Sequence, residues 1–218
     1  MEKIKTLFAH RIFKIIKWVF LILVGIYIVA VLVRAIYLVN KHFADIKTDT
    51  EVEKIHNTKL TLDDVMGKNL PPDPGANADQ TIAGVDANQN GIRDDVELAI
   101  FNTYPNSAKT RAVLLQYALA LQMEATEQIV NTTTVTEIIR EEDRADSCVA
   151  DTLVPRKSPE SSRSNDDMKK IDVFEKFVED KQLDTQERKN YQESFYKNLR
   201  SYNSLPVTCD IDYSTLPN

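Results

Sequence analysis

The sequence predicts a mainly α-helical protein: an N-terminal transmembrane helix, followed by a small helical domain on the exported side of the membrane. Two observations support this fold class. Residues 18–33 form an uninterrupted apolar run, and several segments after residue 94 carry apolar side chains at helical spacing. We find no run of alternating apolar and polar residues that would indicate a β-strand, and no internal repeat.

The transmembrane helix is predicted over residues 18–39. This stretch contains a single charged residue, Arg34, and a bilayer requires roughly 20 mostly apolar residues. Trp18 and Tyr37 suit the two interfacial regions of a membrane. A cleaved signal peptide is the alternative, but the apolar run is longer than the usual signal core and no small-residue cleavage site follows it.

Charge is distributed unevenly on the two sides of this segment. Residues 1–17 carry five Lys or Arg side chains against Glu2 alone. This excess places the basic N-terminus on the cytoplasmic side of a bacterial inner membrane. The C-terminal domain is then periplasmic or extracellular. Residues 48–218 hold 19 basic and 31 acidic residues, a net charge of −12, so we expect no nucleic-acid partner.

The predicted stalk and linker cover residues 40–80. The stalk helix continues to about His56, and Thr61 with Asp64 resembles the capped start of a short helix. The stretch NLPPDPGANADQ is rich in proline and does not suit regular structure, so it is interpreted as a rigid linker or a surface strap.

Residues 81–218 form the predicted helical exported domain. Apolar spacing and capping residues predict helices over 94–104, 108–130, 132–153, 168–181 and 185–205. The helix that begins after Ser107 is apolar on most sides of its first half, so it is expected to be the buried central helix. Asp184 and Glu187 resemble a capping box at the start of the last helix, and the Ser- and Pro-rich residues 155–166 suggest a hinge.

Cys148 and Cys209 are the only cysteines, and both lie on the predicted exported side. An oxidising compartment favours one disulfide between them, which would close a loop of about sixty residues. Two free thiols are the alternative.

Oxygen-bearing side chains are concentrated in the loop 86–97. Calcium takes six to eight hard oxygen ligands, and a glycine at the sharp turn lets a short loop wrap around the ion. The candidate Ca²⁺ ligands are Asp86, Asn88, Asn90, the carbonyl of Ile92, Asp94 and Glu97. A metal-free turn in which Asp and Asn side chains cap the following helix is the alternative.

The stretch DANQNGIRDDVE resembles an EF-hand-like loop, and more closely the DxDxDGxxDxxE loops of thrombospondin type three repeats and related bacterial surface proteins. PPDPG followed by TIAGVDANQNGIRDDVE also resembles an exported, membrane-anchored bacterial family of unknown function. The chain departs from an EF-hand in three ways: the preceding segment cannot be a helix, Arg93 stands where an apolar residue is usual, and no second loop is present.

Catalytic motifs are absent from the sequence. His10, His42 and His56 are expected to lie outside the folded core, which leaves no candidate for Ser-His or Cys-His catalysis. Glu141, Glu142 and Asp143 are interpreted as a solvated helix face.

The sequence therefore predicts a single-pass membrane protein that is calcium-binding and non-enzymatic. Its exported domain would bind another envelope or secreted protein. The alternatives are an envelope inhibitor or immunity-type protein that binds a toxin, and a carboxylate-dependent hydrolase.

Overall fold

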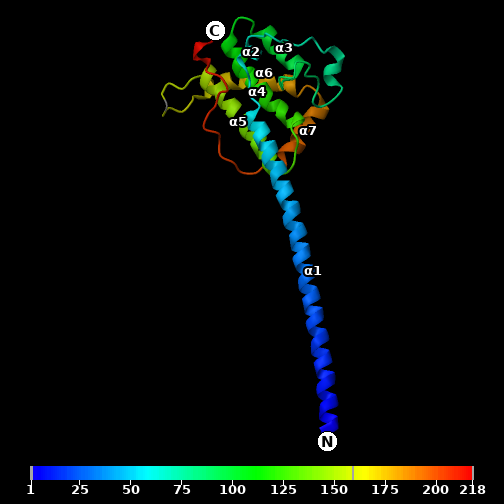
Figure 1. Cartoon of the computed structure of the whole chain (residues 1–218). Helices are drawn as coiled ribbons and strands as arrows, with labels where there is room; N and C mark the ends of the chain where they lie inside the picture. Colours follow the sequence, from blue (N-terminus) through cyan, green and yellow to red (C-terminus); the bar gives the residue numbers. More distant parts are fainter. Residues whose placement is uncertain (1, 159, 218) are drawn as a thin grey trace. The chain divides into compact units, whose positions relative to one another are not determined.

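The computed structural model describes residues 2–158 and 160–217, and the side chains of all of these except 2–12 and 215. This part of the chain contains only helices and irregular segments, which confirms the mainly α-helical prediction (Figure 1). It divides into two compact units, residues 1–47 and 48–218.

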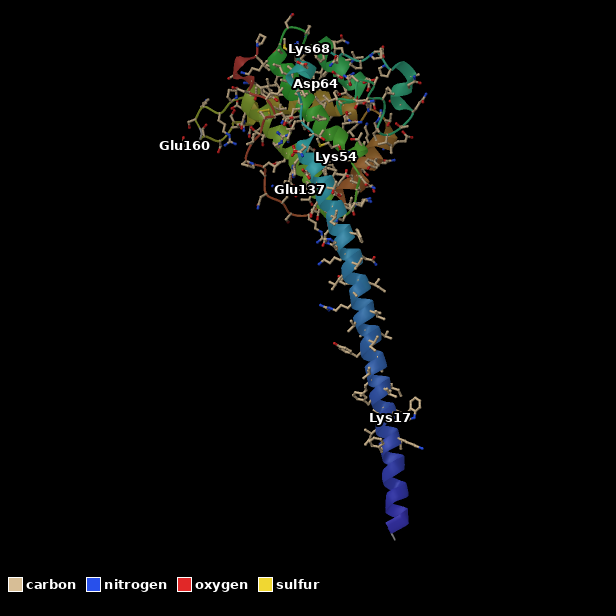
Figure 2. The ribbon with its side chains drawn as sticks, in the orientation of Figure 1. Lys17, Lys54, Asp64, Lys68, Glu137 and Glu160 are labelled. Carbon is tan, nitrogen blue, oxygen red and sulfur yellow. A yellow bond between two sulfur atoms is a disulfide. The ribbon has the colours of Figure 1, made fainter. Side chains whose placement is uncertain are left out.

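Helix α1 (Glu2–Asn57) contains the predicted transmembrane segment. Side chains 13–47 are all exposed, although most of residues 18–39 are apolar (Figure 2). Within the described residues, α1 is the one helix that is long and apolar enough to cross a membrane. The final turns of the same helix belong to the second unit, where Ile55 is fully buried.

The second unit is a bundle of helices joined by ordered loops. Its elements are α2 (Leu62–Val65), η1 (Gly75–Asp79), α3 (Asp94–Thr103), α4 (Ala108–Thr126), α5 (Thr132–Leu153), α6 (Asn165–Gln182), α7 (Gln186–Tyr196) and η2 (Tyr213–Thr215). The N-cap side chains of Ser107, Asn131 and Ser164 accept backbone N–H groups at the starts of α4, α5 and α6. These caps explain why the three helices begin where they do.

Helix α4 is the centre of the bundle, as the sequence predicts. Fifteen of its nineteen residues are buried, and it contacts α3, α5 and α6. Leu60 and Val65, from the segment predicted to be stalk and linker, are also buried in this core. That segment therefore contributes to the hydrophobic core of the second unit.

The prediction for the last helix is wrong at both ends. Thr185, and not Asp184, is the N-cap of α7, because the Asp184 carboxylate binds Arg93 and Arg188 instead. The helix ends at Tyr196 rather than near residue 205. The chain after it is irregular and lies against α4 and α5, where the carbonyls of Asn203 and Thr208 accept hydrogen bonds from Arg140 and Gln116.

Two buried arginines hold the Pro-rich strap and the loop 86–97 against the corner between α6 and α7. Arg93 has no exposed surface, and its guanidinium contacts Asp95, Asp184 and the carbonyls of Lys181 and Gln182. Arg188 contacts Asp184, Asp79 and three carbonyls of residues 78–82. An isolated buried charge would be costly, so these partners are required for the fold.

The predicted disulfide between Cys148 and Cys209 is confirmed. It joins α5 to the irregular C-terminal segment, with the two Cα atoms 5.1 Å apart. Cys148 is fully buried. The bond closes a loop with a sequence separation of 61 residues and so restricts the unfolded chain.

Replacing both cysteines by alanine is expected to lower the free energy of unfolding by roughly 2–4 kcal/mol, because the unfolded chain regains its loop entropy. Chemical denaturation of the oxidised full chain in detergent micelles, compared with the double variant, measures this difference. Equal midpoints for the two proteins would contradict a stabilising role for the bond.

Candidate functional site

The loop 86–97 turns sharply at Gly91, as the sequence predicts. Gly91 has φ of +85°, and a Cβ atom there would lie 2.7 Å from Leu119 of α4. The Asp86 carboxylate accepts the N–H groups of Asn90 and Gly91 at 3.2 and 2.9 Å. Glycine is required both for this backbone conformation and for the close approach to α4.

Glu97 reaches back into the loop from the first turn of α3. Its Oε2 atom accepts the side-chain amides of Asn88 and Asn90 at 3.0 and 3.1 Å, and the side chain is 1 % exposed. The structure thus brings Asp86, Asn88, Asn90 and Glu97 to one turn. Rotating either amide by 180° would present its oxygen in place of its nitrogen, and oxygen is the ligand atom that calcium takes.

Asp94 and Ile92 have different environments from those four residues. The fully buried Asp94 carboxylate accepts the Ala87 N–H at 3.0 and 3.2 Å and so closes the loop on itself. The Ile92 side chain is buried in the core. Among the described residues, no three His, Cys, Asp or Glu side chains form a group that could hold a metal ion, so a cation here would depend on amide, backbone and water oxygens as well.

Two carboxyl groups of the loop, those of Asp94 and Glu97, have raised pKa values. Burial raises the pKa of Glu97 to about 7, against the opposing effect of the two Asn amides, and the nearby Asp64 and Asp94 carboxylates add to the rise. Burial is also the main cause of a raised pKa at Asp94. Both carboxyl groups are therefore harder to ionise than an ordinary one, and a bound cation would favour their charged forms.

An open groove of about 620 Å³ lies beside the loop. One wall is formed by Asp86, Gln89 and Asn90, and the other by residues 54–61 at the end of α1 and after it. Every lining residue except Gly91 has a polar side chain, and Lys54 and Glu127 among them form an ion pair. The loop is thus reachable from solvent on this side.

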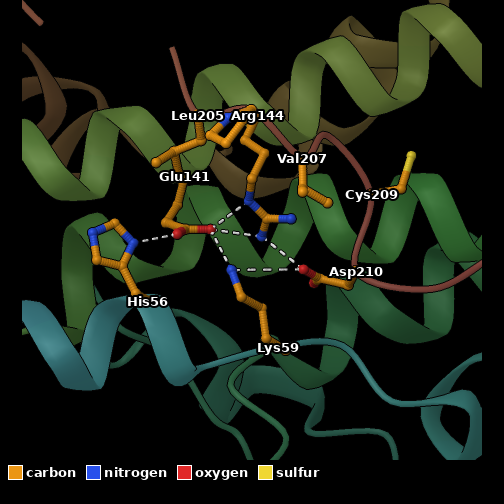
Figure 3. A pocket seen from close by; sticks show the side chains of 9 residues that line it. His56, Lys59, Glu141, Arg144, Leu205, Val207, Cys209 and Asp210 are labelled. Carbon is orange, nitrogen blue, oxygen red and sulfur yellow. Dashed lines mark hydrogen bonds and ion pairs between the residues drawn. The ribbon is translucent and has the colours of Figure 1, made fainter. Parts of the chain in front are cut away.

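A second site of interest is the cluster of ionic side chains around Glu141 of α5 (Figure 3). The Glu141 carboxylate is 1 % exposed and lies 2.6 Å from His56 Nδ1 and 2.8 Å from Lys59 Nζ. Arg144, one turn along α5, approaches it to 2.6 Å and also contacts Asp210 at 2.7 Å. We call these five residues the Glu141 ion cluster.

The Glu141 ion cluster corrects two expectations from the sequence. Glu141 is buried rather than part of a solvated face, and His56 is packed into the second unit rather than outside it. Burial alone would raise the pKa of Glu141, but hydrogen bonds from Lys59 and His56 and the charge of Arg144 hold it below its ordinary value. Its ionised form is therefore stabilised by its neighbours.

The arrangement around His56 does not suit a general base. Its Nδ1 atom faces Glu141 and its Nε2 atom faces Glu137 of α5 at 2.9 Å, so each ring nitrogen has a carboxylate partner. The i, i+4 spacing of Glu137 and Glu141 indicates that both side chains lie on the same face of a helix. The sequence does not indicate which basic residues contact this face.

No protein-family model, curated protein or solved structure matches the chain.

Replacing Glu141 by glutamine should destabilise the protein by about 3 kcal/mol, because it leaves the cationic side chains of Lys59 and Arg144 beside a buried neutral amide. Chemical denaturation of the full chain in detergent micelles measures the loss. Glu193→Gln makes the same chemical change at an exposed position of α7 and should shift the free energy of unfolding by less than about 0.5 kcal/mol. A Glu141→Gln effect as small as that of the control would show that the cluster adds no stability.

Proposed function

We propose that this protein is a single-pass, membrane-anchored, calcium-binding interaction protein of the bacterial envelope, and that it is not an enzyme. Helix α1 would cross the inner membrane with its basic end in the cytoplasm, and the second unit would lie in the periplasm or outside the cell. Its partner would be another envelope or secreted protein.

The observation that carries the calcium proposal is the convergence of Asp86, Asn88, Asn90 and Glu97 on one glycine turn. The remaining ligands would be the Ile92 carbonyl, Asp94 or a water molecule held by it. Two of the side-chain ligands are neutral amides, so we expect a weak site, with a dissociation constant on the order of 10⁻⁴ to 10⁻³ M. Such a site would remain filled in a calcium-containing environment and would serve to order the structure.

The contacts of Arg93 suggest what an ordered loop would do. Arg93 directly precedes Asp94 and is bound to the end of α6, so the loop and the corner between α6 and α7 are fixed together. Calcium would hold the Pro-rich strap, the start of α3 and this corner as one rigid surface for a partner. The net charge of −12 for residues 48–218 favours a basic partner. A basic toxin would be such a partner, so an inhibitor or immunity-type function is the second candidate.

The environments of the acidic residues on α5 do not favour the hydrolase alternative. Glu141 is surrounded by His56 and the cationic side chains of Lys59 and Arg144. Both oxygens of Glu142 accept a hydrogen bond from the hydroxyl of Tyr196. A general acid or base needs a carboxyl group that faces a substrate proton. We therefore propose binding rather than hydrolysis.

The test is thermal unfolding of the oxidised full chain in detergent micelles with calcium, magnesium or a chelator. At about 10 mM calcium, a concentration roughly 10 to 100 times the expected dissociation constant, linkage gives about 1.4–2.7 kcal/mol of stabilisation. For a unit of this size that corresponds to a rise in melting temperature of about 3–10 °C. Magnesium should give little of this shift, because it requires a tighter octahedral site.

Asp86→Ala and Glu97→Gln should each abolish the calcium-dependent rise, whereas Glu193→Gln should retain it. Glu97→Gln preserves the shape of the side chain and removes only its charge, so a lost response would reflect ligation rather than misfolding. If wild-type protein melts at the same temperature in calcium and in chelator, the loop is a metal-free capping turn and the calcium proposal is wrong.

A further inference from the structure

Six carboxyl groups gather between α4, α5 and α6 without a cation among them. We call them the carboxyl cluster: Glu124 of α4, Glu142, Asp143 and Asp146 of α5, and Glu175 and Glu179 of α6. The ion pairs of the described residues involve other carboxylates. Lys176 is the cation recorded near Glu179, but it is exposed and its ammonium binds Asp180 at 3.0 Å.

The carboxyl cluster contains two pairs of carboxyl groups, and the two members of each pair lie on different helices. Glu124 of α4 meets Glu142 of α5, and Asp146 of α5 meets Glu175 of α6. Two ionised carboxylates in contact repel each other and have no hydrogen to share, whereas one proton turns the contact into a hydrogen bond. Glu175 Oε1 is buried without a hydrogen-bond partner among the described residues, so an ionised Glu175 would leave a buried charge without a donor.

The remaining groups that face the carboxyl cluster are neutral donors or further acids. Tyr196 of α7 donates to both oxygens of Glu142 at 2.8 and 2.9 Å, and Tyr117 of α4 donates to Glu179 at 2.9 Å. Gln192 of α7 donates to Glu124 at 3.4 Å. The other titratable neighbours are Asp172 of α6, Tyr191 of α7 and Tyr202 of the C-terminal segment. None of these groups supplies a positive charge.

We propose that the carboxyl cluster is a proton-dependent contact that holds α6 and α7 against α4 and α5, and that loosens as its shared protons are lost at rising pH. The contact depends on the two carboxyl pairs and on the Tyr196 hydrogen bonds, each of which joins two different helices. None of these groups belongs to the loop 86–97, so the proposal does not rest on the calcium proposal.

The direction of the pH effect follows from the protonation of the folded state. Burial, with neighbouring carboxylates adding to it, raises the pKa of Glu124 to about 8 and that of Glu175 to about 9, and it raises the pKa of Glu142 as well. An unfolded glutamate has a pKa of about 4.3. Between these values the folded protein holds more protons than the unfolded chain, so stability falls as pH rises through this window.

The experiment compares unfolding of the full chain with that of Glu142→Gln/Glu175→Gln, in detergent micelles with a chelator, between about pH 6 and pH 9. Each retained proton makes the unfolding equilibrium constant rise by up to about tenfold per pH unit. For the wild type we expect the unfolding equilibrium constant to rise at least about tenfold between about pH 6 and pH 9. The double variant, whose amides can donate a hydrogen bond at any pH, should show less than half of this rise on a logarithmic scale.

Glu193→Gln should reproduce the wild-type profile. Glu97 also has a raised pKa, but it is present in every chain compared, so its effect cancels in the difference. An unchanged pH dependence in the double variant would overturn the proposal.

A second measurement does not require the variant to fold. Carbon-13 NMR of glutamate side-chain carboxyls in the wild type should show at least two groups other than Glu97 that titrate above pH 7, with Glu97 identified by the signal that is lost in Glu97→Gln. Amide hydrogen exchange in α6 and α7 should accelerate with pH beyond the intrinsic rate, and more than in α4. If every glutamate titrates below pH 6, the shared protons do not exist and the proposal is wrong.

Discussion

The burial of Arg93 is the constraint on which the second unit depends. A guanidinium without exposed surface must find acceptors for its five N–H groups, and these come from Asp95 and from the far end of α6. Arg93 lies within the loop 86–97 and consequently fixes this loop to the corner between α6 and α7. Asp184 extends the connection to Arg188, which holds the strap from the other side. Regions distant in sequence thus share one set of polar contacts.

Buried acidic side chains are accommodated in two opposite ways within the same bundle. In the Glu141 ion cluster, three basic side chains surround one carboxylate and keep it ionised. In the carboxyl cluster, on the same helix α5, Tyr hydroxyls and carboxyl pairs take the place of cations. Glu142 of the carboxyl cluster directly follows Glu141, so α5 carries both arrangements side by side. The two clusters should therefore respond differently to acid and alkali.

Local patterns in the sequence predicted that the helices exist, but not the end of α7 or the contacts that join the helices. The caps at Ser107 and Asn131, the apolar character of α4 and the twelve-residue loop are all encoded within short windows. Glu141 meets residues 56 and 59, and Asp210 joins the cluster through Arg144; no periodicity links those positions. The end of α7 at Tyr196 was missed for the same reason, since long-range contacts of residues 203–210 outweigh local helix propensity.

The spread of the Glu141 ion cluster along the chain bears on how the protein is made. His56 and Lys59 emerge first from the ribosome, Glu141 and Arg144 follow, and Cys209 and Asp210 come last. Until the last of these appears, Arg144 lacks one carboxylate and Cys148 lacks its partner. The second unit therefore cannot complete its folding before Cys209 and Asp210 have been made, and the segments made earlier stay exposed to aggregation until then.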